Sequence, residues 1–292
     1  MIWGSTWLVI TWQLGVVAPE VSVTYRFAIA SLLLAVGCIA TRRSLRFPAR
    51  DHAFLAGVGL LMICVNYILI YWAERSVASG LVAVVYSTIV FMTPIGMRVA
   101  FGAPLRPRLF VAATLGVVGV ALMFLPELVE ARRGGSMAVG VAFTLAAAAA
   151  CAAGNLIAVR NHNAGIPTIA GTVWTMTYGT LFAALVAVAR GSPWTFDARP
   201  AYVLSLAYLA VFGSVVAFAT YFALLKRVGA GPSSYTAVAT PVLAILLSAL
   251  FEGYRWSSIA VLGVLLAVLG NALALRAAPG RGAPRPDPPA HE

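Results

Sequence analysis

Charged side chains are scarce in this sequence of 292 residues: 10% are Asp, Glu, Lys or Arg, whereas 61% are hydrophobic. Soluble globular domains carry about 25% charged residues. The composition therefore excludes a soluble enzyme, a nucleic-acid-binding protein and a disordered chain. The formal net charge of +11 indicates membrane topology rather than nucleic acid as a partner, because cytoplasmic loops collect Lys and Arg.

Residues with reactive or metal-binding side chains are also few. The three cysteines, Cys38, Cys64 and Cys151, lie in apolar stretches and have neither a CxxC pair nor a metal-binding spacing. We expect buried thiols rather than disulfides. The sequence contains no HExxH, P-loop or GxSxG motif, which are common signatures of enzymes. We therefore expect neither a cofactor nor a metal site, and an integral-membrane enzyme is the least favoured alternative.

Apolar segments, by contrast, are abundant, and charged residues, Pro or Gly separate them. A transmembrane helix needs about 20 apolar residues, and a helix satisfies its backbone hydrogen bonds internally. The sequence therefore predicts an all-α integral membrane protein with ten transmembrane helices. The predicted helices cover residues 2–18, 22–41, 52–73, 79–101, 109–126, 137–159, 168–189, 201–225, 231–251 and 257–275.

The distribution of basic residues predicts the orientation of these helices. With the N-terminus inside, roughly twice as many Lys and Arg residues lie in cytoplasmic segments as in outer segments, which is the bias that membrane proteins follow. We therefore expect a multi-pass protein of the cell membrane with both termini in the cytoplasm. The Pro-rich segment 277–292 is expected to be a disordered cytoplasmic tail.

The two halves of the chain are similar to each other. Shifting the sequence by 151 positions aligns residues 74–122 with residues 225–273 without a gap. The glycines that coincide are Gly80 with Gly231, Gly102 with Gly253, and Gly119 with Gly270. Residues 1–130 and 137–276 are therefore predicted to be two repeats of five helices each. Because five is odd, the second repeat crosses the membrane in the opposite sense, as in transporters that work by alternating access.

Several short motifs resemble those of the EamA-type family in the drug/metabolite transporter superfamily. They are WGSTW at 3–7, YRF at 25–27, YFALLKRVGAGPSSY at 221–235, TP at 240–241, Glu252, and GVLLAVLGNAL at 263–273. The resemblance covers residues 2–276. It implies ten helices with a central cavity between the first four helices of each repeat, while the fifth and tenth helices are peripheral. It also implies export of amino acids, metabolites or drugs.

Polar side chains within the predicted spans are the candidates for a substrate cavity, because polar groups in a membrane usually face the protein interior or a water-filled path. Tyr67, Tyr71 and Glu74, for example, lie on one face of a helix. The predicted cavity residues are Ser5, Thr6, Asn66, Tyr67, Tyr71, Tyr86, Asn155, Tyr221, Ser233 and Thr236. The alternative for each Ser or Thr is a hydrogen bond to its own helix or a contact between helices.

Four residues are predicted to act in gating: Arg26, Glu74, Pro94 and Pro241. Arg26 is the one basic residue within a predicted span apart from Arg98, which lies at the cytoplasmic end of the span 79–101. Its side chain either extends to the membrane surface or pairs with Glu20 or Glu74. A proline within a helix frees a carbonyl one turn back, so both prolines are predicted to kink their helices. Because no acidic residue or histidine lies at the middle of a span, we favour facilitated diffusion or exchange over coupling to protons.

The sequence thus favours a secondary transporter that exports small metabolites, such as amino acids or drug-like amphiphiles. The expected partners are a small-molecule substrate and membrane lipids, with the protein as a monomer or homodimer. A flippase for a lipid-phosphate or sugar-phosphate is the main alternative. It needs several basic residues facing the cavity, and Arg26 is the one basic residue that lies away from the cytoplasmic ends of the predicted spans.

Overall fold

We describe the fold from a computed structural model of the chain. It describes residues 2–77, 79–105, 107–123, 125, 136–229, 232, 233, 236, 240, 243 and 257–277. All regular secondary structure in these residues is helical, which confirms the all-α class for the part described. The predicted span 231–251 lies almost entirely outside these residues. The predicted tail does as well, beyond residue 277.

Five helical stretches are long and apolar enough to cross a membrane: Pro19–Ala40, Ala49–Glu74, Ala138–Asn163, Thr168–Ala189 and Pro200–Val228. Four shorter apolar helices accompany them, at Ile2–Thr11, Ile89–Phe101, Pro107–Gly119 and Ser258–Gly270. The chain is therefore built as a multi-pass membrane protein. The individual elements are α1 (Ile2–Thr11), α2 (Pro19–Ala40), α3 (Ala49–Val58), η1 (Gly59–Val65), α4 (Asn66–Glu74), α5 (Ser79–Tyr86), α6 (Ile89–Phe101), α7 (Pro107–Met123), α9 (Ser136–Asn163), α10 (Thr168–Ala189), α11 (Pro200–Ala210), η2 (Val211–Val216), α12 (Ala217–Val228) and α15 (Ser258–Ala277).

Two predicted helices differ from the structure in their extent. α1 ends at Thr11 rather than at residue 18, because Gly15 has φ +115°, a conformation that a helix does not contain. The helix predicted at 79–101 is broken between Tyr86 and Ile89. The proline that was predicted to kink this helix, Pro94, lies inside α6. At the break Ser87 and Thr88 donate their hydroxyls to backbone carbonyls of the preceding turn, and such bonds compete with regular helix formation.

Two stretches of π-helix interrupt long helices, and the sequence does not predict either of them. The segment η1 lies between α3 and α4, and η2 lies between α11 and α12. A π-helix widens the turn and occurs often at functional sites. Residues 60–65 of η1 and residues 211–216 of η2 coincide when the chain is shifted by 151 positions.

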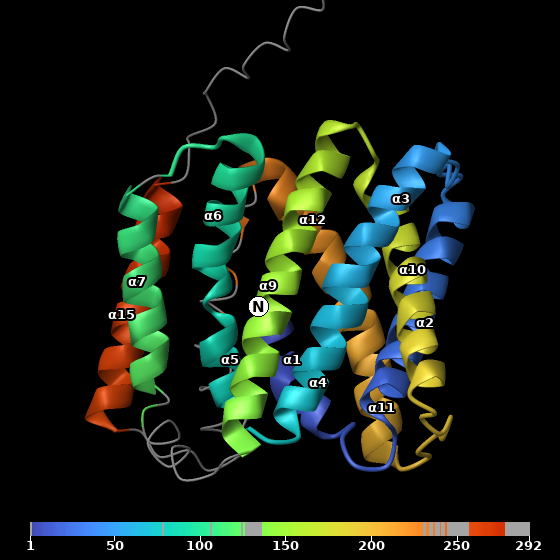
Figure 1. The fold of residues 1–292 in the computed structure, drawn as a ribbon, viewed down its shortest axis with the longest axis horizontal. Coiled ribbons are helices and arrows are strands. Elements are labelled where there is room, and N and C mark those ends of the chain that lie inside the picture. The colour runs from blue at the N-terminus through green and yellow to red at the C-terminus, as the bar shows by residue number, and fades with distance from the viewer. Residues whose placement is uncertain are drawn as a thin grey trace, which may run out of the picture.

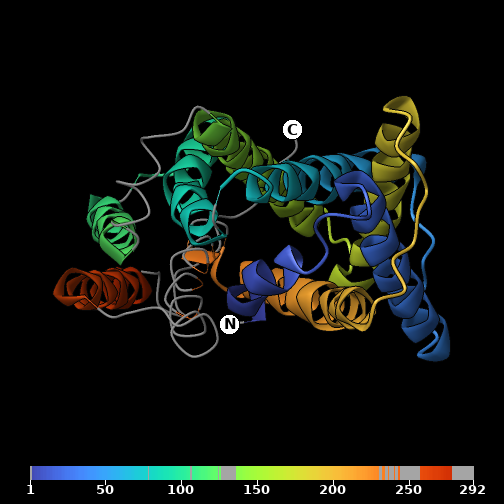
Figure 2. The same ribbon diagram turned by 90° about the horizontal axis from the view of Figure 1, so that it is seen from below.

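The helices α7 and α15 stand side by side at one end of the molecule, apart from the main bundle (Figures 1 and 2). The helices α2 and α10 pack together at the opposite end. The central helices α1, α4, α5, α9 and α12 lie between these two pairs (Figure 1). The peripheral place of α7 and α15 is the one that the family resemblance implied, and it leaves the central helices to build the cavity.

Candidate functional site

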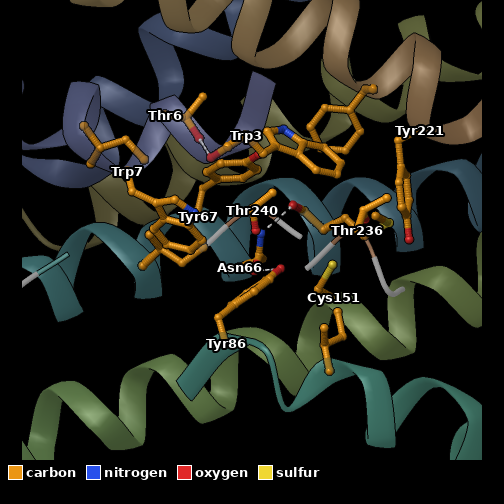
Figure 3. A pocket seen from close by; sticks show the side chains of 15 residues that line it. Trp3, Thr6, Trp7, Asn66, Tyr67, Tyr86, Cys151, Tyr221, Thr236 and Thr240 are labelled. Atoms are coloured by element: carbon orange, nitrogen blue, oxygen red, sulfur yellow. Dashed lines mark hydrogen bonds between the residues drawn. The ribbon is translucent and has the colours of Figure 1, made fainter. Parts of the chain in front are cut away.

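A cavity lies among the central helices, and it encloses about 670 Å³ including the space at its mouth. Figure 3 shows side chains from α1, α4, α5, α9 and α12 around it. The residues that line it are Trp3, Thr6, Trp7, Ile10, Met62, Asn66, Tyr67, Ile70, Tyr86, Ile89, Cys151, Phe218, Tyr221, Thr236 and Thr240.

Aromatic rings form much of the wall. Trp3 and Trp7 lie one turn apart on α1, which places both on one face of that helix. The ring of Trp3 lies 5.1 Å from Tyr221 and 5.5 Å from Phe218. The ring of Trp7 lies 5.7 Å from Tyr86 on α5 in an edge-to-face arrangement. The two tryptophans therefore contact different helices, and the cavity has flat apolar surfaces on more than one side.

Asn66 is the polar centre of the cavity. It begins α4 directly after the π-helical segment, and its Nδ2 donates to the carbonyl of Met62 at 3.3 Å. The hydroxyl of Tyr86 donates to its Oδ1 at 3.0 Å, as Figure 3 shows. On the other side of the cavity, the hydroxyl of Tyr221 donates to Asn155 Oδ1 at 2.9 Å. These two bonds hold α5 to α4 and α12 to α9.

The threonines of the cavity bond to their own helices. Thr6 donates to the carbonyl of Trp3 at 2.8 Å, and Thr236 donates to the carbonyl of Ser233 at 2.9 Å. Both threonines also line the cavity. A hydrogen bond to its own helix and a place in the cavity lining therefore occur in the same residue. Each hydroxyl oxygen keeps a lone pair for a solute, while its proton is committed to the helix.

Six of the ten predicted cavity residues line this cavity: Thr6, Asn66, Tyr67, Tyr86, Tyr221 and Thr236. The other four lie outside its lining. Ser5 bonds to the hydroxyl of Tyr208 at 2.7 Å, because it is one position away from the face that carries Thr6. Tyr71 lies one turn beyond Tyr67 and donates to Gln13 at 2.7 Å. Asn155 is behind Tyr221, and Ser233 is fully buried.

Sequence reasoning missed most of the apolar lining. The apolar lining residues that were not predicted are Trp3, Trp7, Ile10, Met62, Ile70, Ile89 and Cys151. Phe218 and Thr240 also line the cavity; the sequence places Phe218 on one helix face with Tyr221, and Thr240 on one face with Thr236. Apolar residues in a membrane span do not stand out from those that face lipid. One usable signal was present, because the spacing of Trp3 and Trp7 in WGSTW places two large rings on one face of a short helix.

Arg26 neither extends to the surface nor pairs with Glu20, and both of those predictions are wrong. Its side chain has 0% exposure. The guanidinium donates to Ser214 Oγ at 3.0 Å and to the carbonyl of Gly213 at 3.2 Å, both in η2. It also lies 4.5 Å from the centre of the Tyr67 ring, a cation–π contact. A basic group in a span is thus held by the π-helical segment and covered by an aromatic ring of the cavity.

Glu20 has partners of its own at one end of α2. Its carboxylate accepts hydrogen bonds from Arg190 at 3.2 Å, from Trp72 at 3.3 Å, and from Ser192. Glu20 was one of the two predicted partners of Arg26, and its carboxylate instead binds these three residues. They tie the start of α2 to α4 and to the residues that follow α10.

The remaining gating candidates are placed only in part. Glu74 is 8% exposed, and neither of its carboxylate oxygens has a hydrogen-bond partner within the described ranges. Its carboxylate makes no ion pair with Arg26 within the 4.0 Å limit in those ranges. Pro94 lies inside α6, while Pro241 lies outside the residues that the structure describes.

Comparison with known proteins identifies a family and several relatives. A model of the EamA-like transporter family matches residues 1–125 and 139–276. An uncharacterized inner membrane transporter of Escherichia coli strain K12, YedA, is 27% identical over 286 residues, which cover 94% of this chain and 89% of YedA. Protein PagO of Salmonella typhimurium strain LT2 is 23% identical and covers 94% of this chain and 90% of its own length. One crystal structure superposes with a TM-score of 0.75 at 19% identity, over 94% of this chain and 93% of its own, and it supports the fold alone.

Proposed function

This chain belongs to the EamA-like transporter family, and we propose that it is a secondary transporter that exports small metabolites by alternating access. Amino acids and drug-like amphiphiles are the solutes that we expect. One observation carries the proposal: a single cavity takes its walls from both matched segments of the chain. Trp7 and Tyr86 come from the first segment, and Phe218 and Tyr221 come from the second. A site at the interface of two repeats is where such transporters bind their solutes.

The peripheral helix pair supports the proposed inversion of the repeats. A Cβ placed on Gly119 of α7 would lie 2.6 Å from the carbonyl oxygen of Gly263 of α15, and a Cβ on Gly270 would lie 2.6 Å from that of Ala112. Ala112 corresponds to Gly263, and Gly119 corresponds to Gly270, under the same shift of 151 positions. Later residues of α7 meet earlier residues of α15, so the pair is antiparallel. Reciprocal contacts of this kind are what a two-fold axis produces.

The two π-helical segments give a second line of support. They fall at equivalent positions of the proposed repeats 1–130 and 137–276. Both lie in helices that contact the cavity or support it, since Met62 of η1 lines the cavity and Gly213 of η2 accepts from Trp3 and Arg26. A widened turn at equivalent places gives the two repeats the same local irregularity, as repeats with a common architecture should have. In this proposal Arg26 and Glu74 act in the gate, and both termini lie in the cytoplasm.

A flippase for a phosphate-bearing lipid or sugar is the second candidate, and the cavity favours it less. Phosphate recognition relies on Arg or Lys side chains. The described lining contains neither residue type, and the sequence from 229 to 251 contains no charged residue. The family and YedA are both described as transporters, which favours a transporter over an enzyme.

A resistance panel tests the proposed function. Cells that overproduce the protein are exposed to toxic amino acids, purines and dyes, and growth is compared for the wild type and for Asn66→Ala, with Asn163→Ala at the exposed end of α9 as the matched control. Export predicts resistance to one chemical class that Asn66→Ala abolishes and Asn163→Ala preserves. Increased sensitivity would indicate import. An unchanged response to every compound would contradict the proposed transport.

A further inference from the structure

The cavity contains one buried hydrogen-bond donor that is not used. Trp7 is 7% exposed, and its indole Nε1 has no hydrogen-bond partner in the described part of the chain. The other tryptophan of the cavity is different, since Trp3 Nε1 donates to the carbonyl of Gly213 at 3.1 Å. A buried N–H without an acceptor costs stability. Trp7 lines the cavity, so a bound solute with an acceptor could satisfy its indole N–H.

Four hydroxyl groups of the cavity lining already donate their protons within the protein. Tyr86 and Tyr221 donate their protons to asparagine oxygens, and Thr6 and Thr236 donate theirs to backbone carbonyls. Each hydroxyl oxygen remains able to accept. These four hydroxyl groups therefore offer acceptors to a solute, whereas the indole N–H of Trp7 is a buried donor without a partner in the described part of the chain.

The charge around the cavity disfavours ionic solutes of either sign. The described lining carries no charged side chain, so a carboxylate would lose its hydration without gaining a charged partner. One buried charge lies against the lining: the guanidinium of Arg26 is 4.5 Å from the centre of the Tyr67 ring. Its positive charge opposes the binding of a cation on that ring. An uncharged solute avoids both costs.

The aromatic walls favour a flat solute. Trp3, Phe218 and Tyr221 form one group of rings, and Trp7 and Tyr86 form another. Aromatic rings attract one another in offset-stacked or edge-to-face arrangements, so a planar ring system gains contacts from both groups. A branched aliphatic solute of equal size would gain fewer of them.

We propose that the cavity binds an uncharged planar aromatic solute whose hydrogen-bond acceptor receives the indole N–H of Trp7. The proposal rests on the proposed function, because it treats this cavity as the site of transport. It narrows the solute class to neutral heteroaromatic compounds and away from free amino acids, whose carboxylate finds no charged partner in the described lining.

Binding of small heteroaromatic probes tests the proposal. Isothermal titration calorimetry on the full-length protein in nanodiscs, with empty nanodiscs as the baseline, compares 7-azaindole with indole at pH 7.5. The two probes share their size and their N–H, but 7-azaindole adds one ring acceptor. We expect 7-azaindole to bind about three- to tenfold more tightly, the usual effect of one hydrogen bond. Tryptamine and indole-3-acetate, which carry opposite charges, should bind more weakly than 7-azaindole.

A pair of variants assigns that preference to Trp7. Trp7→Phe keeps an aromatic ring and removes the N–H, so it should abolish the preference for 7-azaindole while indole affinity changes little. Trp12→Phe is the matched control, because Trp12 is 52% exposed and lies outside the lining. Equal affinities for 7-azaindole and indole in the wild type would overturn the proposal, even if Trp7→Phe did not fold. Tighter binding of either charged probe, or a preference that survives in Trp7→Phe, would also overturn it.

These outcomes are separate from those of the resistance panel. If 7-azaindole and indole bind equally but the cells resist another chemical class, the proposed solute class is wrong and the proposed transport function stands. If 7-azaindole binds as expected but the response to every toxic compound is unchanged, the proposed transport function is wrong instead.

Discussion

Gly119 of α7 and Gly270 of α15 make the same contact in opposite directions. Gly119 lies against the backbone of Gly263 and Ala267 in α15, and Gly270 lies against the backbone of Ala112 and Gly116 in α7. The two glycines are equivalent under the shift that aligns the halves of the chain. The sequence suggested the equivalence, and the structure adds that the equivalent positions meet in an antiparallel pair.

The glycine contact makes a prediction about stability. Gly119→Ala and Gly270→Ala should each destabilise the protein by about 1–3 kcal/mol, because the added methyl group forces the two backbones apart. Gly37→Ala in α2 is the control, since nothing lies within 4 Å of a Cβ at that position, and it should stabilise by about 0.5–1 kcal/mol. Titration with SDS in mixed micelles measures these changes. A neutral effect at Gly119 and Gly270 would contradict the close packing.

The buried pair formed by Tyr221 and Asn155 provides a second prediction. Tyr221→Phe leaves the buried oxygen Oδ1 of Asn155 without its donor, which should cost about 1–3 kcal/mol. Tyr25→Phe removes a longer and exposed hydrogen bond to Thr195, and a surface change of this kind should stay within about 0.5 kcal/mol. The same unfolding assay compares them. Equal effects of the two substitutions would argue against a structural role for the buried pair.

Arg26 provides a third prediction, because its guanidinium makes two hydrogen bonds and one ring contact at once. Lysine lacks that planar fork. Arg26→Lys should therefore destabilise the protein by about 1–3 kcal/mol and weaken resistance in the growth panel. Arg98→Lys is the control, since Arg98 makes an exposed hydrogen bond to the carbonyl of Gly102 and a surface change of this kind should stay within about 0.5 kcal/mol. Wild-type behaviour of Arg26→Lys would show that the fork is not required.

The three cysteines provide a fourth prediction, which concerns access to the cavity. Cys151 lines the cavity, while Cys38 and Cys64 are buried elsewhere at 1% exposure. A small methanethiosulfonate reagent should modify Cys151 faster than the other two, and 7-azaindole should slow that reaction. Mass spectrometry identifies the modified residue, and Cys151→Ser should abolish the fast reaction. Faster modification of Cys38 or Cys64 would contradict the assignment of Cys151 to the solute path.

Most of the helices could be predicted from the sequence because length and apolar composition determine a membrane span. The interruptions could not. The π-helical segment η2 is held from outside itself, since Gly213 accepts hydrogen bonds from Trp3 and Arg26, which are about 200 residues away in the chain. Such contacts leave no local pattern. The break before α6 had a local sign in Ser87 and Thr88, but Pro94 was the more conspicuous residue.

The polar part of the cavity was predictable for a similar reason. Asn66, Tyr67 and Tyr86 stand out because polar groups in apolar spans are costly. Position along the helix was harder to judge, and Tyr71 lies one turn too far to line the cavity. The aromatic walls were not predictable from composition, because Phe218 looks like any lipid-facing residue until its neighbours on other helices are known.

The central claim is that two five-helix units face opposite ways across the membrane and enclose one cavity, and labelling of introduced cysteines tests it most directly. Arg43→Cys and Arg199→Cys are placed singly in a variant without the native cysteines, at exposed sites after α2 and before α11. Intact cells are treated with a membrane-impermeant maleimide. The account predicts labelling at position 199 at once and at position 43 only after the membrane is permeabilised. Labelling of both positions from the same side would contradict it.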